Sequence, residues 1–173
     1  MSRNAVVLFS VWTSLLSAIF YFFYGFTPFG VPWVMFVCLA IFFGMGGSMK
    51  DVPAMVLSAL AGCVWGKVDF LLMDAFQHLG LNPDAASFVS ITLGTAVTMV
   101  LHLYVLGKTP LRHMPFIFAG VCLTFSQNNG NTLGLALTLV IGIVLAALCS
   151  LGMQYAMKRF PLPAGEDGAP GEN

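Results

Sequence analysis

The stretch "GFTPFGVPW" at Gly25–Trp33 has a counterpart, "GKTPLRHMPF" at Gly107–Phe116. Both carry Gly-x-Thr-Pro, followed within a few residues by a second proline and then an aromatic residue. The two Thr-Pro steps begin at Thr27 and Thr109 and so stand 82 positions apart. A connector that is written twice in a chain of 173 residues predicts that the chain as a whole is a duplication.

The composition predicts an integral membrane protein. Hydrophobic residues make up 58% of the sequence and charged residues only 8%, and the mean hydropathy is +0.90. A soluble domain carries about 25% charged residues, so this chain has too few charges to solvate a globular surface. The lipid bilayer is therefore its first expected partner. Because the formal net charge is zero, no long-range field points to nucleic acid.

Six apolar segments have the character of membrane spans, which need about 20 residues to cross the hydrocarbon core. The first segment follows Arg3 and resembles a secretory signal, but it is too long for one and no A-x-A site follows it. The Pro-, Gly- and acid-rich residues 161–173 are predicted to form a disordered cytoplasmic tail. The expected spans are 5–26, 32–49, 52–73, 85–107, 114–128 and 131–157, of which the second and fifth are short.

Basic residues predict the orientation of these spans. With six spans, the termini and two of the loops share one side, and they hold all six basic residues that lie outside the spans. The three loops on the other side hold none. Because loops rich in lysine and arginine stay in the cytoplasm, both termini are predicted to be cytoplasmic. The six residues are Arg3, Lys50, Lys108, Arg112, Lys158 and Arg159.

A comparison of the halves extends the duplication beyond the connectors. At an offset of 84, small residues between Gly46 and Gly66 fall on small residues between Gly130 and Ser150. The predicted fold class is an all-α integral membrane protein with six transmembrane helices in one domain, 1–160. It is built from two three-helix repeats, 1–80 and 85–160, which are inverted because each has an odd number of spans. Inverted repeats recur in channels and transporters.

Small residues spaced by four lie along one face of the third and the sixth spans. Such residues allow two helix backbones to approach closely. We expect these two spans to cross on the repeat axis, with Ser58 and Gly62 facing Gly142 and Ala146; a stripe that lines a pore directly is the alternative. The residues assigned to helix packing are Ser58, Gly62, Gly66, Gly142, Ala146 and Ser150.

A group of polar residues marks the outer ends of the spans. Lys67 is expected about 24 Å along the third span, at 1.5 Å per residue, where a lysine can reach the membrane interface. Charges at membrane depth indicate function by default, and an interfacial charged cluster is the structural alternative. The run "SQNNGN" at 126–131 either caps helix ends or forms a polar mouth. The candidate outer vestibule consists of Lys67, Asp69, Asp74, Asn128 and Asn129.

Hydroxyl-bearing residues occupy comparable depths in the first and fourth spans. Such hydroxyls usually bond to backbone carbonyls or to a neighbouring helix, but in symmetry-related spans they could line a hydrated path. His102 is either an interhelical hydrogen-bonding residue or a gate that responds to pH. The candidate substrate path consists of Ser10, Thr13, Ser17, Thr95, Thr98 and His102.

Phenylalanines crowd the second and fifth spans, where packing against lipid or core is their default role. One aromatic constriction per repeat is the functional alternative, because hydrophobic narrowings gate by dewetting. The candidate constriction consists of Phe36, Phe42, Phe118 and Phe125. The four cysteines lie in apolar runs without C-x-x-C spacing, and we interpret them as packing residues rather than metal ligands: Cys38, Cys63, Cys122 and Cys149.

The connector "TPF…PW", the helix end "CLAIFFGMGGS" and the hairpin "SQNNGN" give the chain a resemblance to the small YcdZ-like inner-membrane proteins of bacteria. That family has no characterised function, and the resemblance covers nearly the whole chain. It implies the fold and a location in the bacterial inner membrane, but no site residue. In size and span count the chain is also similar to the bacterial urea-channel and acetate-channel families, which form homo-oligomers. This second likeness is one of architecture alone.

The inverted repeat favours a passive channel or facilitator for a small neutral solute or a weak acid. Coupled transport ranks second, because no carboxylate is expected near the midplane. A third hypothesis is a non-transporting scaffold or accessory subunit. A polar-lined path between the repeats would favour transport, and a dry, close-packed centre would favour the scaffold. Because no nucleophile with its base, metal-ligand pair or phosphate-binding loop is found, we expect neither an enzyme nor a cofactor.

Overall fold

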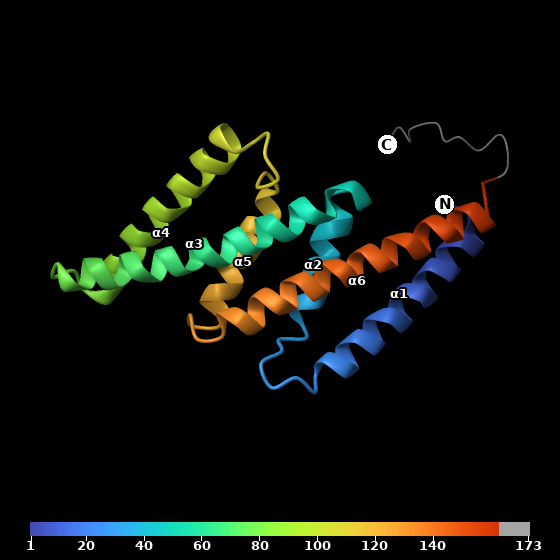
Figure 1. The fold of residues 1–173 in the computed structure, drawn as a ribbon, viewed down its shortest axis with the longest axis horizontal. Helices are drawn as coiled ribbons and strands as arrows, with labels where there is room; N and C mark the ends of the chain where they lie inside the picture. The colour runs from blue at the N-terminus through green and yellow to red at the C-terminus, as the bar shows by residue number, and fades with distance from the viewer. Residues whose placement is uncertain (163–173) are drawn as a thin grey trace, which may run out of the picture.

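A computed structural model describes residues 1–162 and shows a helical protein (Figure 1). Within this range the regular elements are six α-helices, one 3-10 turn and one π-helical segment, with no strand. The tail predicted at 161–173 therefore lies almost entirely outside the described residues. The elements are α1 (Arg3–Tyr24), α2 (Val34–Gly44), η1 (Met49–Asp51), α3 (Val52–His78), α4 (Pro83–Val100), the π-helix η2 (Leu101–Val105), α5 (Met114–Ser126) and α6 (Thr132–Arg159).

Four of these helical segments are long and apolar enough to cross a membrane, which confirms the expectation of membrane-spanning helices. They are α1, η1 with α3, α4 with η2, and α6. The remaining two, α2 and α5, are apolar but have only 11 and 13 residues. Both correspond to the segments that the sequence predicts to be short.

Helix α3 extends beyond its predicted end at 73 and stops only at His78. Gly80 ends it with a left-handed backbone, φ +96°, and its N–H donates to the Gln77 carbonyl at 3.0 Å. Asn82 then caps α4 by accepting a hydrogen bond from the Ala85 N–H at 2.8 Å. In the longer helix Lys67 lies two residues, or about 3 Å at 1.5 Å per residue, from the α3 midpoint at Trp65.

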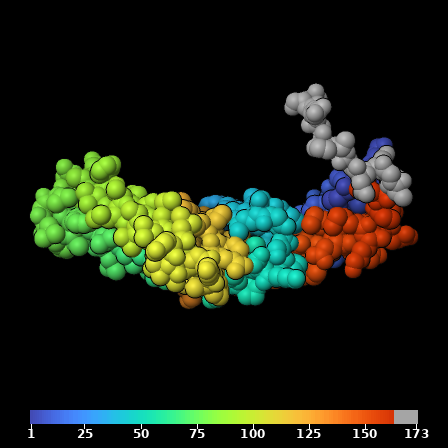
Figure 2. Space-filling model, turned by 90° about the horizontal axis from the view of Figure 1, so that it is seen from above, coloured from blue at the N-terminus to red at the C-terminus, as the bar shows by residue number. Residues whose placement is uncertain are grey.

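The helices form two groups that meet at the centre of an elongated molecule (Figures 1 and 2). In one group α3 packs against α5 and α4, and in the other α6 packs against α2 and α1. The two long helices, α3 and α6, also contact each other. As a result, α4 lies at one end of the molecule and α1 at the other (Figure 1).

The turns after α2 and α5 have the same hydrogen-bond arrangement, at the same sequence spacing as the two Thr-Pro steps. After α2, the Gly46 and Gly47 N–H groups donate to the Phe43 and Phe42 carbonyls at 3.0 and 2.9 Å. After α5, the N–H groups of Asn128 and Asn129 donate to the Phe125 and Thr124 carbonyls at 3.0 and 3.2 Å. All four donors have positive φ, which glycine and asparagine adopt most readily. The "SQNNGN" run therefore ends a helix, as one of its two predicted roles requires.

The two Gly-x-Thr-Pro connectors also share one local structure. The Thr27 hydroxyl donates to the Tyr24 carbonyl at 2.6 Å, and the Thr109 hydroxyl donates to the Leu106 carbonyl at 2.7 Å. In each connector the backbone N–H of the threonine donates to the same carbonyl as its hydroxyl does. The sequence repeat is thus matched by a repeat of turn geometry.

Two glycines allow close helix approaches that differ from the expected ones. A Cβ on Gly62 would overlap the Ile117 carbonyl and lie 3.0 Å from the Gly120 Cα, both in α5. A Cβ on Gly142 would lie 2.8 Å from the Cys38 sulfur and 3.0 Å from the Met35 Cα, both in α2. The small residues therefore bring α3 onto α5 and α6 onto α2. The expectation that Gly62 and Gly142 serve chiefly the α3–α6 crossing is corrected.

These contacts also correct the register between the third and sixth helices. Gly62 meets Ile117 and Gly120 in the same way as Gly142 meets Met35 and Cys38, so Gly142 is the structural counterpart of Gly62. The sequence alignment pairs Gly62 with Ala146 instead, which is one helical turn too far along α6. A stripe with a small residue at every fourth position matches itself after a slide of one turn. The sequence alone therefore does not define its register.

The centre of the molecule is apolar and closely packed. One cluster joins buried side chains from α2, α3, α5 and α6. Ser58 and Thr138, which are fully buried polar residues of α3 and α6, bond to the connectors rather than to each other. The largest apolar side chains that are fully buried are Phe42, Phe116, Met35, Met55, Ile117, Leu135, Leu139, Ile143 and Leu145.

Candidate functional site

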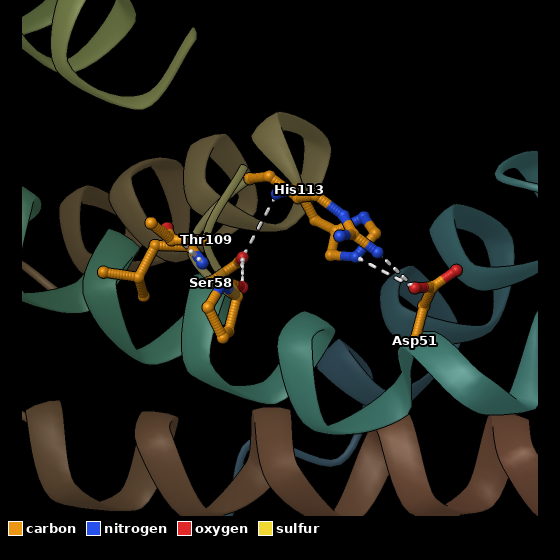
Figure 3. A network of polar contacts seen from close by, with 7 residues as sticks. Asp51, Ser58, Thr109 and His113 are labelled. Carbon is orange, nitrogen blue, oxygen red and sulfur yellow. Dashed lines mark hydrogen bonds and ion pairs between the residues drawn. The ribbon is translucent and has the colours of Figure 1, made fainter. Parts of the chain in front are cut away.

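Residues 107–113, which we call the inner connector, lie across α3 and are held by Ser58 (Figure 3). The Ser58 hydroxyl donates to the Pro110 carbonyl at 3.2 Å and accepts from the His113 N–H at 3.2 Å. Inside the connector, the Leu111 N–H donates to the Thr109 hydroxyl at 3.2 Å. One buried hydroxyl of α3 thus binds two backbone groups of the segment that leads into α5.

A charged group stands at the end of the same connector. The Arg112 guanidinium donates to Asp51 Oδ1 at 2.6 Å, and the His113 ring points toward the same oxygen (Figure 3). His113 Nε2 is 3.9 Å from Asp51 Oδ1, which is too long for a hydrogen bond but short enough for an ion pair if the ring is protonated. Because Arg112 is exposed, we expect this pair to contribute little to stability on its own.

Burial lowers the pKa of His113 below its ordinary value. The Asp51 carboxylate acts in the opposite direction, and the Arg112 guanidinium lowers the pKa further. With a lowered pKa, the folded state holds fewer protons on His113 than the unfolded state does. The stability that His113 contributes is therefore present above its unfolded pKa, about 6.5, and is lost as the pH falls through the folded pKa.

We expect the melting temperature of the detergent-purified protein to fall on acidification from about pH 7 to about pH 5, the range in which histidine charges. His113→Gln should flatten part of that fall, because glutamine does not charge. His78→Gln is the control, because His78 is exposed and its loss should leave the slope unchanged. A melting temperature that rises on acidification only when His113 is present would mean that the attraction to Asp51 dominates.

His102 lies in the π-helix η2 and connects α3 to the inner connector. Its Nε2 accepts a hydrogen bond from Trp65 Nε1 at 2.9 Å, and its Nδ1 lies 2.7 Å from the Leu111 carbonyl. Because Trp65 can only donate and the carbonyl can only accept, the ring carries its proton on Nδ1. With 2% of its surface exposed and both ring nitrogens engaged, His102 has the geometry of the interhelical hydrogen-bonding role.

Thr138 of α6 is the counterpart of Ser58. It accepts from the Val31 N–H at 3.3 Å, as Ser58 accepts from His113, and Val31 and His113 have the same spacing as the Thr-Pro steps. Thr138 also lies 2.9 Å from the Tyr24 hydroxyl and donates to the Gly134 carbonyl at 2.6 Å. The sequence predicts only a packing role for Ser58 and no separate role for Thr138. Counting the 82-residue spacing of the connectors forward from Ser58 gives a position two residues from Thr138. This spacing is the sequence signal that would have identified both residues.

Polar residues also line the contact between α3 and α4. On α4 and η2, every fourth residue from Ser90 to His102 is buried, and α4 packs against α3. We call this contact the α3–α4 seam. Its buried polar groups belong to Trp65 and Asp69 of α3 and to Ser90, Thr98 and His102 of α4 and η2.

The predicted substrate path is divided between the two ends of the molecule. Thr98 and His102 belong to the α3–α4 seam, and Thr95 beside them is partly buried. Ser10 is exposed on α1, while Thr13 and Ser17 face an open groove between α1 and α2 that Phe36 also lines. Since α1 and α4 lie at opposite ends (Figure 1), a single chain does not bring the two sets of hydroxyls together.

The predicted outer vestibule is brought together only in part. Lys67 Nζ donates to Asn129 Oδ1 at 3.2 Å, and Asp74 and Asn128 are exposed. Asp69 is the exception, because it is buried in the α3–α4 seam and does not face an open vestibule. Asp69 lies four residues from the α3 midpoint at Trp65, so it is the carboxylate that bears on the expectation of none near the midplane.

The phenylalanines predicted to form one constriction per repeat differ in their exposure and surroundings. Phe36 is nearly half exposed, with its ring centroid 5.8 Å from that of Tyr21, whereas Phe42 is fully buried in the central cluster. Phe118 is partly buried, and Phe125 stacks on Phe70 of α3 at 4.7 Å between ring centroids.

Within residues 1–162, no three His, Cys, Asp or Glu side chains group as metal ligands would.

The residues assigned to helix packing are buried in the described structure. Gly66 lies against Thr124 of α5, and the Ser150 hydroxyl donates to the Gly47 carbonyl at 3.1 Å. Ala146 is fully buried in the central cluster.

Comparison with known proteins gives a family but no activity. Residues 10–154 match the profile of a family described as "protein of unknown function (DUF1097)". No curated protein and no solved structure matches the chain significantly. Since the match spans most of the sequence, the resemblance to an uncharacterised family is confirmed at this level, and the chain belongs to the DUF1097 family.

Proposed function

We propose that the protein is a membrane facilitator for a small neutral solute or a weak acid, with its polar path along the α3–α4 seam. The observation that carries this proposal is the seam itself, where Asp69, Ser90, Thr98 and His102 are buried between two helices long enough to cross a membrane. Polar and ionisable groups at membrane depth are costly, and they mark solute and ion pathways.

The repeated geometry supports an inverted duplication of six spans. The turns after α2 and α5, the two Thr-Pro connectors and the Ser58 and Thr138 hydrogen bonds all recur at nearly one spacing along the chain. In that duplication α3 ends the first repeat and α4 begins the second, so the seam is an interface between repeats. Transporters built from inverted repeats place their solute sites at such interfaces.

The orientation and the location are part of the same proposal. All basic residues outside the expected spans fall on one side of the six-span arrangement, which supports cytoplasmic termini and an inner connector that faces the cytoplasm. The bacterial inner membrane follows from the family resemblance. A homo-oligomer is also proposed, because α1 buries only Ala5 and Ser17 and leaves a long apolar surface for lipid or for a second copy.

A cysteine placed in the seam tests the path. In a background with the four native cysteines replaced, Thr98→Cys and Val97→Cys are reconstituted in proteoliposomes and assayed with radiolabelled urea, glycerol and acetate. A thiol reagent should stop the flux through Thr98→Cys, because residue 98 is buried in the seam. Val97→Cys is the matched control, since residue 97 is exposed on the next position of the same helix and its modification should leave the flux unchanged.

One observation favours a second candidate function. The centre of the molecule, where the two repeats meet, is filled by an apolar cluster of buried side chains, which is the arrangement expected of a non-transporting scaffold or accessory subunit. Proteoliposomes of the parent protein that are impermeable to all three probes would favour the scaffold. Flux that is blocked equally in Thr98→Cys and Val97→Cys would move the path away from the seam.

A further inference from the structure

Asp69 is a buried carboxyl group near the middle of a helix that is long and apolar enough to cross a membrane. It lies on α3 four residues from the helix midpoint at Trp65, which is about 6 Å along the axis. A hydrocarbon core about 30 Å thick that is centred on this helix therefore contains it. Only 3% of the surface of Asp69 is exposed.

The carboxyl oxygen Oδ1 of Asp69 has no hydrogen-bond partner among residues 1–162. The hydroxyl of Ser90, buried on α4, donates to the backbone carbonyl of Asp69 at 2.6 Å instead of to its carboxyl group. Oδ1 lies directly against Gly94 of α4, where any Cβ would overlap it. A recess that only glycine permits therefore receives a carboxyl oxygen and leaves it unpaired.

No cation is paired with this carboxyl group within the described residues, where both ion pairs belong to Asp51. Lys67 on the same helix donates to Asn129, and His102 is engaged by Trp65 and Leu111. The other charged or titratable groups of α3, α4 and η2 are Asp74, His78, Asp84 and Tyr104, which are exposed, and the buried Cys63. Helices α5 and α6 also pack against α3. Their charged or titratable residues are Cys122 of α5 and Cys149, Tyr155, Lys158 and Arg159 of α6, the last two in its final turn.

An ionised carboxylate in these surroundings would have one oxygen, Oδ1, that is both desolvated and unpaired. Such a group costs several kcal/mol, whereas the protonated acid is neutral and costs only its missing hydrogen bonds. We infer that Asp69 is a proton-binding site, which holds one proton as a neutral carboxylic acid while α3 and α4 are packed together. A metal ion fits less well, since it needs about six oxygen ligands and Oδ1 faces the backbone of a regular helix.

Proton release from Asp69 is coupled to opening of the seam. Loss of the proton leaves a carboxylate that neither α3 nor α4 neutralises, and water is the remaining partner for it. Water reaches Oδ1 only if α4 moves away from α3, because Gly94 covers that oxygen. The seam should therefore open more often at alkaline pH than at acidic pH.

Infrared spectroscopy of the full chain in a maltoside detergent, which has no ester or carboxyl group, tests the proton site. A carboxylic acid has a carbonyl band that a carboxylate lacks, and aspartate and glutamate in water are ionised at about pH 7. The parent protein should show this band at that pH, Asp69→Asn should lose it, and Asp74→Asn, at an exposed position, should keep it. If Asp69→Asn does not fold, parent protein with carbon-13-labelled aspartate should show the band shifted. A parent spectrum without the band, or a band that Asp69→Asn retains, overturns the inference.

Thiol accessibility tests the coupling without relying on transport. Thr98→Cys is prepared with and without Asp69→Asn in the cysteine-free background, and the rate of labelling by a water-soluble thiol reagent is measured between about pH 6 and about pH 9, around the ordinary thiol pKa. Each rate is divided by the fraction of thiolate in that protein, measured by its ultraviolet absorbance, so that titration of the thiol does not enter the ratio. The labelling rate of the protein that retains Asp69, divided by the rate of the Asp69→Asn protein, should rise with pH. A ratio that stays constant with pH, or that changes with the sodium concentration instead, overturns the coupling. This outcome does not depend on whether any solute crosses the membrane.

Discussion

Gly62→Val is expected to remove most of the correctly folded protein from detergent extracts. The first atom of any side chain at this position overlaps the Ile117 carbonyl, which is helix backbone and has no rotamer that relieves the clash. Overpacking in a close-packed interior costs about 1–3 kcal/mol when side chains can adjust, and here α3 and α5 must separate instead. Because folded proteins are stable by only about 5–15 kcal/mol in total, separation of this contact should be close to disabling.

Matched glycine variants make this result specific. Gly44→Val is the control, because Gly44 is exposed and a Cβ there meets nothing within 4 Å. Gly142→Val should also be severe, but less so, because its nearest neighbour is the side-chain sulfur of Cys38. The measurement is the yield and melting temperature of the monodisperse peak in size-exclusion chromatography. A Gly62→Val protein as stable as Gly44→Val would mean that α3 and α5 do not approach at this glycine.

Sequence reasoning locates the helices well because each rests on a signal of its own. Apolar length predicts the long segments, and two short spans are expected where α2 and α5 are found. The predicted end of α3 is wrong because the run from Asp74 to His78 is polar enough to suggest a loop. Its stop signal, Gly80 followed by Asn82 and Pro83, lies further along and would have given the right boundary.

The contacts between helices are harder to predict, for two physical reasons. A periodic stripe such as Ser58–Gly62–Gly66 has no unique partner, so the sequence indicates close packing without saying against which helix. Depth along a helix also depends on where the helix ends, and the early end predicted for α3 places Asp69 at an interface although it is buried near the middle. The connectors are better guides, because a Thr-Pro turn occurs only twice and its spacing is unambiguous.

His102→Leu is expected to loosen the contact of the inner connector with α3. Leucine fits the space but leaves Trp65 Nε1–H and the Leu111 carbonyl without their partners, which lie 2.9 and 2.7 Å from the ring nitrogens. Each buried polar group left unpaired costs about 1–3 kcal/mol. Two such groups should lower the melting temperature by more than any single exposed substitution, and should raise proteolysis within residues 107–113.

A double-mutant cycle with Trp65→Phe separates the hydrogen bond from packing. Trp65→Phe alone leaves His102 Nε2 unpaired, whereas the double variant removes donor and acceptor together. The double variant should therefore be more stable than the sum of the two single changes predicts, by about 0.5–3 kcal/mol, as is typical of residues in one network. His102→Gln should lie between the parent and His102→Leu, because an amide both donates and accepts. Strict additivity in this cycle, with a harmless His102→Leu, would show that Ser58 and the Arg112–Asp51 pair hold the inner connector without His102. His102 would then contribute only its volume to the α3–α4 seam.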